Sequence, residues 1–260
     1  TSYHPELQLS ENISASEDLG GVVNGAEYIL VATPSSIFHK IIPRLEPHIH
    51  SSASVISCTK GIQPEPFSTM TEIISKHLGH IIGDRVGALS GPNLAKEIAD
   101  QKIAGTVIAS SNQSLSSEIK SILSSGTFKV FSSTDTQGVE LAGALKNIYA
   151  ICCGIAHAKD VGENALGFMV TRSMAEMSRF AVAKGANPIT FLGLAGMGDL
   201  MATCTSKLSR NFQLGELLGS DMSLQEAKDK VGQVAEGART LEVVFLEAKK
   251  MDVNMPMVDS

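Results

Sequence analysis

Positively charged residues are few in this sequence, and they do not cluster. The 260 residues include 21 Lys and Arg against 27 Asp and Glu, a formal net charge of −6, and no basic run is longer than the pair Lys249 and Lys250. Binding the phosphates of a nucleic acid requires a concentrated basic face. We therefore expect no nucleic-acid partner.

Long apolar runs are also missing. The longest, residues 148–156, is interrupted only by a glycine, and it is far shorter than the roughly 18 to 20 residues that span a membrane. Hydrophobic residues make up 43% of the chain and charged residues 18%, which is typical of a packed core and not of a disordered chain. We expect a globular protein without a membrane span.

The cysteines are too few and too irregularly spaced for a metal site or a disulfide framework. Cys58, Cys152, Cys153 and Cys204 have no metal-ligand spacing, and adjacent cysteines on a helix point their side chains apart. We therefore expect no bound metal and a reducing, cytoplasmic location. The sequence also begins at Thr1 without a signal peptide, so we interpret it as part of a longer chain of one or two domains.

In the first half, short apolar runs rich in β-branched residues alternate with helical patterns. Residues 27–33 (EYILVAT) and 54–59 (SVISCT) each end in a turn, as buried parallel strands do, and residues 35–45 between them have helical spacing. This predicts a strand–helix–strand crossover. Further along, we expect helices at 65–78, 93–99 and 115–123, and strands at 86–89, 106–109 and 128–131. The pattern predicts an α/β fold with a parallel sheet.

After Asp135 the β-branched runs stop and long helical patterns take over. We expect helices at 136–158, 162–184, 187–192, 210–218, 223–231 and 237–251. The sequence thus predicts two domains, an α/β domain over residues 1–134 and an all-helical domain over residues 135–260.

Lys146 is the most informative residue. Within residues 137–156 the only charged side chains are Glu140 and Lys146, and the helical neighbours of Lys146 are small or apolar. Burial lowers the pKa of a lysine toward the range in which its neutral amine accepts a proton, so Lys146 is a candidate general base. The alternatives are a lysine that extends to solvent and a structural ion pair with Glu140.

Asp199 is the second candidate. It lies in the segment 194–202 (LAGMGDLMA), where glycines and apolar residues surround one carboxylate. Glycines there indicate that a helix or a ligand approaches the backbone closely. The alternative is that Asp199 caps the helix that follows. No strand precedes this segment, so its glycines are not a dinucleotide-binding fingerprint.

Ser209, Arg210 and Asn211 stand at the start of an expected helix. Free amides at a helix N-terminus and a guanidinium both favour an anion, although Ser209 could be an ordinary cap with Arg210 in solvent. Lys60 and residues 90–93 (SGPN) each follow a strand, so their loops should face one crevice at the carboxyl ends of the strands, unless they are plain turns.

Two further positions are less specific. Glu236 opens the last long helix, where it could be either a cap or a ligand contact. His157 lies on an apolar helix end without an acid one turn away, and we interpret it as structural.

Taken together and in this order, the motifs resemble the bacterial type of NAD(P)-dependent glycerol-3-phosphate dehydrogenase. The resemblance covers nearly the whole chain and rests on residues 31–35 (VATPS), 59–62 (TKGI), 90–97 (SGPNLAKE), 138–147 (GVELAGALKN), 191–205 (FLGLAGMGDLMATCT), 208–211 (LSRN) and 235–240 (AEGART). It implies an incomplete Rossmann-like dinucleotide-binding domain followed by a helical substrate domain.

The resemblance also implies an activity and a set of site residues. The enzyme would interconvert dihydroxyacetone phosphate and sn-glycerol 3-phosphate with NAD or NADP, supply phospholipid synthesis and form a homodimer. Lys146 would exchange the proton. Substrate contacts would come from Lys60, Gly91, Asn93, Asn147, Asp199, Thr203, Ser209, Arg210 and Asn211, although the family usually has a hydroxyl residue at the position of Asn93. Cofactor contacts would come from Lys60, Ala95, Arg210, Val234 and Glu236.

The resemblance also implies that part of the enzyme lies outside this sequence. The family begins with a strand, a glycine-rich turn and a helix, which we do not identify before residue 27, and it continues into a further helix at the other end. We therefore expect the bare chain to bind cofactor poorly.

Two other functions stay open. A hydroxy-acid dehydrogenase of the related β-hydroxyacid group would also place a lysine on the first long helix, but Asn147 directly after Lys146 and the anion site at Arg210 suit glycerol phosphate better. A non-catalytic binding protein descended from the enzyme would have no need to keep buried charges at Lys146 and Asp199.

Overall fold

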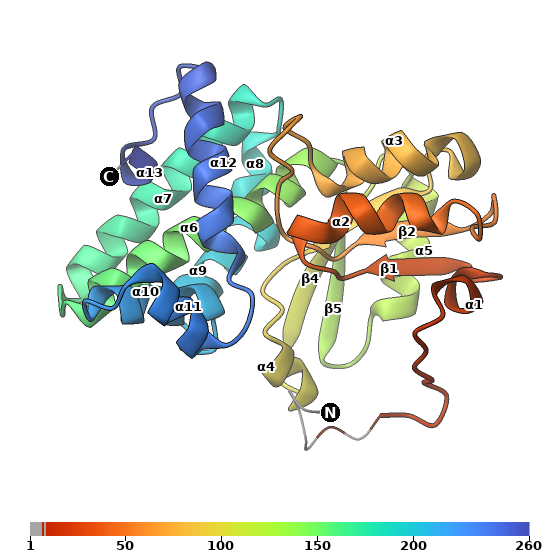
Figure 1. Cartoon of the computed structure of the whole chain (residues 1–260), viewed down its shortest axis with the longest axis horizontal. Helices are drawn as coiled ribbons and strands as arrows, with labels where there is room; N and C mark the ends of the chain where they lie inside the picture. Colours follow the sequence, from red (N-terminus) through yellow and green to blue (C-terminus); the bar gives the residue numbers. More distant parts are fainter. Residues whose placement is uncertain (1–6, 8, 260) are drawn as a thin grey trace.

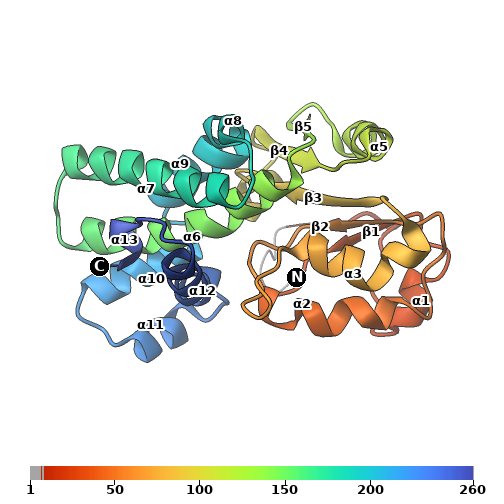
Figure 2. The same cartoon turned by 90° about the horizontal axis from the view of Figure 1, so that it is seen from above.

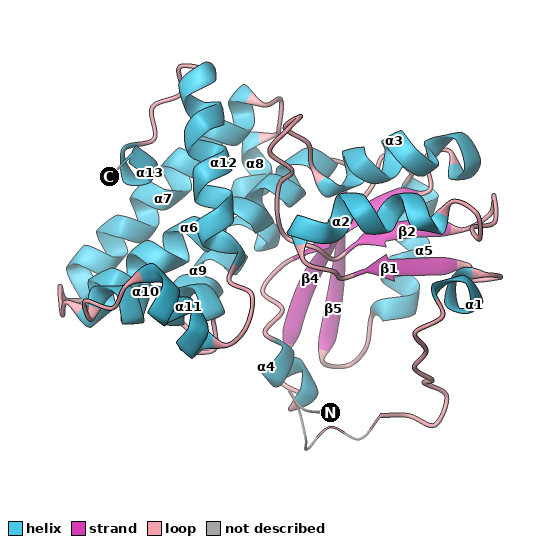
Figure 3. Ribbon diagram, in the orientation of Figure 1, coloured by secondary structure: helices cyan, strands magenta, loops and turns pink. Residues whose placement is uncertain are grey.

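A computed structural model describes residue 7 and residues 9–259 of the chain. This part folds into a sheet covered by helices and a second unit made of helices alone (Figures 1 and 3). Among the described residues, every strand precedes residue 136.

The sheet has five strands in the order in which they occur in the chain. They are β1 (Tyr28–Val31), β2 (Ser54–Ser57), β3 (Val86–Ser90), β4 (Ala104–Ala109) and β5 (Phe128–Ser133). The pairs β1–β2, β2–β3 and β4–β5 are parallel, as predicted, but β3–β4 is antiparallel. The expected parallel sheet is therefore confirmed for three of the four strand pairs, and β3–β4 departs from it. The connection between β3 and β4 contains only the short helix α4 (Ala95–Ala99) and turns back at the same end of the sheet.

Helices cover both faces of the sheet (Figure 2). On one face lie α1 (Leu19–Val23), α2 (Ser35–Ile41), the 3₁₀ helix η1 (Ile42–Leu45) and α3 (Met70–Ile82), and on the other lies α5 (Gln113–Leu123). Val55 and Ile56 are adjacent in β2, point to opposite faces and are both fully buried. Burial of both faces explains why two apolar residues are adjacent in this strand instead of alternating with polar ones.

Helix α3 begins five residues later than the sequence pattern predicts. Thr69 and Glu72 form a capping box that fixes the start at Met70. Residues 61–69 are consequently a loop and not the first turns of a helix.

The helical unit is built around α6. Its elements are α6 (Thr136–Ala158), α7 (Glu163–Ala183), α8 (Pro188–Leu192), the π-helical turn η2 (Leu194–Gly198), α9 (Asp199–Thr205), α10 (Arg210–Gly219), α11 (Leu224–Val231), α12 (Glu236–Lys250) and α13 (Pro256–Asp259). Side chains of α6 form the main core together with Met177, Phe180, Leu200 and Val244.

Two structural details identify α6 as a core helix. It is long and apolar enough to cross a membrane, but 83% of its most apolar stretch is buried inside the protein. It also crosses α10 so closely that a side chain at Gly154 or Gly215 would overlap the backbone of the other helix.

Asp135, the residue just before α6, contacts the starts of two helices of the helical unit. Its Oδ1 accepts the Gly138 N–H at 2.9 Å and so caps α6, while its Oδ2 accepts the Asn187 N–H at 3.1 Å and the Thr190 hydroxyl. One carboxylate therefore fixes the starts of both α6 and α8.

Candidate active site

Two lysines meet one buried carboxylate at the carboxyl ends of the first three strands. Lys60 follows β2, Lys146 lies in the middle of α6, and Asp199 is the first residue of α9. Lys60 Nζ lies 2.7 Å from Asp199 Oδ2, and Lys146 Nζ donates to Asp199 Oδ1. Lys146 also donates to the Thr203 hydroxyl at 2.6 Å, and Lys60 to the Gly91 carbonyl at 2.8 Å. The structure therefore brings Lys60, Lys146 and Asp199 into direct contact.

Lys146 is buried and its proton is held weakly. Lys146 is only 6% exposed. Burial is the main cause that lowers the pKa of Lys146 to about 7, the positive charge of Lys60 adds to this, and Asp199 acts in the opposite direction. An amine with this pKa can give up and take back a proton near neutral pH.

The simpler interpretations of Lys146 and Asp199 are not supported. Lys146 neither extends to solvent nor pairs with Glu140, because the Glu140 carboxylate accepts hydrogen bonds from Thr71 instead. The cap position of α9 is occupied by Gly198, and Asp199 makes no side-chain cap. Its two oxygens are used by the two lysines.

A second cluster joins three helix segments beside Lys146. Asn211 Nδ2 donates to Asn147 Oδ1 at 3.0 Å, and Asn211 Oδ1 accepts the Gly237 N–H at 2.9 Å. Ser209 caps α10 by accepting the Phe212 N–H at 3.3 Å. Arg210 is exposed, and its guanidinium has no hydrogen-bond or ion-pair partner in the described part of the chain. A free guanidinium at a helix N-terminus is a suitable anion contact.

Glu236 lies over the carboxyl ends of β1 and β2. It accepts the Ser35 N–H at 2.9 Å and the Ser35 hydroxyl at 2.6 Å, and Arg239 donates to the same hydroxyl at 3.2 Å. Ser35 and Arg239 were not among the predicted site residues. The only available signal was the position of Ser35 directly after a strand and a proline.

The same edge fits a polar cofactor. Thr33 Oγ1, in the loop after β1, is buried and lacks a hydrogen-bond partner among the residues described. Lys60 and Glu236 place opposite charges at this edge, and Ala95 and Val234 are exposed. An unpaired buried hydroxyl and exposed loops at the carboxyl ends of strands are what a ribose or a nicotinamide amide would use.

Gly91 and Asn93 are placed differently from one another. The Gly91 carbonyl faces Lys60. Asn93, by contrast, uses both ends of its amide on β4: its Nδ2 donates to the Gly105 carbonyl at 3.0 Å, and its Oδ1 accepts the Thr106 hydroxyl at 2.9 Å. The Asn93 side chain is therefore held by the protein in this structure.

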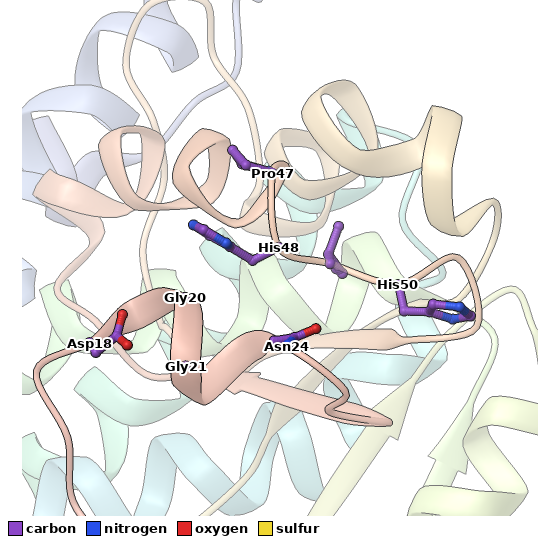
Figure 4. A pocket seen from close by; sticks show the side chains of 8 residues that line it. Asp18, Gly20, Gly21, Asn24, Pro47, His48 and His50 are labelled. Atoms are coloured by element: carbon purple, nitrogen blue, oxygen red, sulfur yellow. The ribbon is translucent and has the colours of Figure 1, made fainter.

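The remaining candidates lie outside this site. His157 pairs with Glu216 at 3.1 Å, so its acid partner comes from α10 and not from its own helix. In the described part of the chain, no group of three His, Cys, Asp or Glu residues could hold a metal, and all four cysteines are free. A surface hollow lined by Asp18, His48 and His50 (Figure 4) lies where the chain enters β1 and β2, at the opposite ends of these strands.

Two models of one protein family match this chain. The profile of the NAD-dependent glycerol-3-phosphate dehydrogenase N-terminus matches residues 1–116, and the profile of the C-terminus of the same family matches residues 135–260. The chain belongs to the NAD-dependent glycerol-3-phosphate dehydrogenase family. It is an NAD(P)-dependent oxidoreductase with a Rossmann-type fold.

Several individual relatives are similar to this dehydrogenase over nearly its whole length. The chain is 47% identical over 257 residues to glycerol-3-phosphate dehydrogenase [NAD(P)+] of Alcanivorax borkumensis, covering 99% of the chain and 74% of the relative. It is also 47% identical to the enzyme of Acinetobacter baumannii strain SDF, covering 99% and 71%. The crystal structure of glycerol-3-phosphate dehydrogenase from Coxiella burnetii superposes with a TM-score of 0.93 at 34% identity, covering 98% of this chain and 77% of that one.

Proposed function

We propose that this dehydrogenase interconverts dihydroxyacetone phosphate and sn-glycerol 3-phosphate, and that Lys146 exchanges the proton. The observation that carries the proposal is the buried Lys146 ammonium, held between Asp199 and Thr203 with a pKa of about 7. The family membership supports the substrate pair, and it weighs against both the hydroxy-acid and the non-catalytic alternatives.

The cofactor, when bound, supplies or accepts the hydride at the central carbon of the substrate. In the direction of reduction, protonated Lys146 donates a proton from Nζ to the carbonyl oxygen; in oxidation, neutral Lys146 accepts the hydroxyl proton. Lys60 stabilises negative charge on the same oxygen, and Asp199 orients both ammonium groups through its two oxygens.

The substrate phosphate would bind at the start of α10. Arg210 and Asn211 are proposed to hold it, with Ser209, Asn147 and Thr203 around the glycerol part. The phosphate is remote from the reacting carbon, so its binding energy orients that carbon. Gly91, Asn93 and Lys60 complete the proposed substrate contacts, and Lys60, Ala95, Arg210, Val234 and Glu236 the proposed cofactor contacts.

The first experiment measures loss of NADH and NADPH absorbance with dihydroxyacetone phosphate in the full-length enzyme. We expect Lys146→Met, which removes the ammonium but keeps most of the side-chain volume, to lower kcat/KM by about a hundredfold or more. Lys159→Met is the matched control, because Lys159 ends the same helix and forms an ion pair with Asp221 away from the site.

Two outcomes would contradict the proposal in different ways. No consumption of either cofactor by the wild-type enzyme would exclude this substrate. Equal activity in wild type and Lys146→Met would keep the substrate and remove Lys146 from the proton transfer.

We also infer the setting of the enzyme. Its product, sn-glycerol 3-phosphate, would supply phospholipid synthesis, and four free cysteines support a reducing, cytoplasmic location.

Residues 1–134 would form the cofactor domain and residues 135–260 the substrate domain. Exposed apolar side chains on α7 and α8, including Phe168, Ile189 and Leu192, support a homodimer, which sedimentation equilibrium would test.

A further inference from the structure

Glu140 is a buried charged residue that the proposed chemistry does not use. It lies on α6, is 7% exposed and accepts hydrogen bonds from the Thr71 N–H at 2.9 Å and from the Thr71 hydroxyl. Burial raises the pKa of Glu140 to about 7, and the two bonds from Thr71 oppose this effect. Burying a carboxyl group costs free energy unless hydrogen bonds compensate, so the group that Glu140 contacts is informative.

Thr71 lies in the first turn of α3, where backbone amides lack partners within the helix. Thr69 satisfies the Glu72 amide, and Glu140 satisfies the Thr71 amide from outside the helix. The positive end of the helix dipole also favours a carboxylate at this position. Glu140 therefore fastens the start of α3 to α6.

The chain between Lys60 and Thr71 is held against α6 at both ends. At one end, the stem of Lys60 lies beside Gly143, where an added Cβ would be 3.5 Å from Lys60 Cγ, and Lys60 Nζ reaches Asp199. At the other end, Thr71 reaches Glu140. Glu140, Gly143 and Asn147 occupy successive turns on one side of α6.

The loop between these two ends is also ordered by contacts. Gln63 and Ser68 exchange backbone hydrogen bonds at 2.9 and 3.0 Å, and Phe67 packs on Phe180 of α7. The loop therefore transmits a displacement of one end to the other instead of absorbing it.

We propose that Glu140 is a positioning residue for Lys60: by fixing Thr71 on α6, it holds the 60–71 segment so that the Lys60 ammonium stays on Asp199 beside Lys146. The inference rests on the proposed function, because it assigns Lys60 to the substrate oxygen.

A double-mutant cycle between Glu140 and Lys60 tests this. Glu140→Ala is expected to lower kcat/KM for dihydroxyacetone phosphate by about tenfold to a hundredfold, the range that misplacement of a reacting group produces. In a Lys60→Met background, the same substitution is expected to cost less than about twofold, because there is no ammonium left to position. An equal loss in both backgrounds would overturn the proposal and leave Glu140 as a structural residue.

Further variants separate positioning from stability. Glu140→Gln is expected to keep activity within about threefold of wild type, because its amide can still accept from the Thr71 N–H and donate to the Thr71 oxygen. Glu176→Ala is the matched control, since Glu176 is also a buried carboxylate that accepts a backbone amide at a helix start, that of Met257. It is expected to lower Tm and leave kcat/KM unchanged. If Glu140→Ala does not fold, Thr71→Val replaces it in the cycle.

A measurement that does not depend on catalysis tests the role of Glu140 separately from the proposed function. Acylation of Lys60 Nζ by an activated ester, followed by mass spectrometry, is expected to be at least about threefold faster in Glu140→Ala than in wild type, because an amine no longer held on Asp199 is more accessible to the reagent. Unchanged labelling would overturn the role of Glu140 even in an active enzyme. An inactive wild type would instead contradict the proposed function.

Discussion

Lys146 owes its chemistry to residues that are distant in sequence. Asp199, which is 53 positions away, accepts from it, and Lys60 approaches the same carboxylate from the other unit of the protein. One negative charge is thus shared by two ammonium groups. Burial, and after it the charge of Lys60, lowers the pKa of Lys146 to about 7, while Asp199 opposes the change.

The charge of Lys60 should therefore contribute, in addition to burial, to the pH dependence of the enzyme. Oxidation needs neutral Lys146, so kcat/KM for glycerol 3-phosphate should rise with pH through about 7, and reduction should fall over the same range. Lys60 lowers the pKa of Lys146, so Lys60→Met should raise that pKa and move both profiles by about one unit to higher pH.

Profiles of kcat/KM against pH in both directions measure this, with Lys102→Met as a control for loss of an exposed lysine paired to Glu97. A midpoint that stays in place, or moves to lower pH, would show that Lys60 does not act on Lys146 through its charge.

At the scale of elements, Asp135 is the clearest case of one side chain with two structural roles, because it contacts the N-terminal ends of both α6 and α8. Removing an ordinary helix cap costs about 1 kcal/mol. Asp135→Ala should cost roughly twice that, because α6 and α8 both lose a partner for their first turns.

Urea denaturation compares this variant with Ser223→Ala, which removes the cap of α11 alone. Equal free energies of unfolding for the two variants would mean that the contact to α8 contributes nothing.

Elements with strong local signals could be predicted, and those set by distant contacts could not. The bounds of α6, Thr136–Ala158, agree with the pattern because its apolar residues and the Asp135 cap are local. The start of α3 differs from the apolar pattern because the polar capping box of Thr69 and Glu72 determines it. The direction of β4 has no local signal, since parallel and antiparallel strands share one periodicity.

The same limit applies to the site. The motifs that contain Lys146, Asp199 and Lys60 could be found in the sequence, and the family resemblance implied that these residues share a substrate site. The Ser35–Glu236 contact joins residues 201 positions apart, and the Thr71–Glu140 contact joins residues 69 positions apart. Neither pair has a spacing or a motif that would indicate the partner.

At the scale of the molecule, the Ser35–Glu236 contact spans the gap between the sheet unit and α12. If Glu236 contacts the cofactor as proposed, Ser35 orients its carboxylate with two donors. Ser35→Ala removes the hydroxyl donor, and we expect KM for NADH to rise about threefold to tenfold with little change in kcat.

Steady-state kinetics at saturating dihydroxyacetone phosphate give both constants, and Ser36→Ala, at the exposed neighbouring position, is the control. A fall in kcat without a change in KM would place Ser35 in the chemical step instead.

The reversed strand β4 has a geometric consequence for α6. Because β5 is parallel to β4, it runs away from the carboxyl end of β3, and its last residue, Ser133, is level with Ala88 inside β3, so the chain must turn back to reach the site. Helix α6 must cover the remaining distance, from Val139 beside Val107 to Lys146, which is about 10 Å along its axis. One residue inserted after Gly143 would turn Lys146 by about 100° away from Asp199. In this stretch the number of helical residues determines both how far the Lys146 ammonium lies along the axis and the direction in which it points.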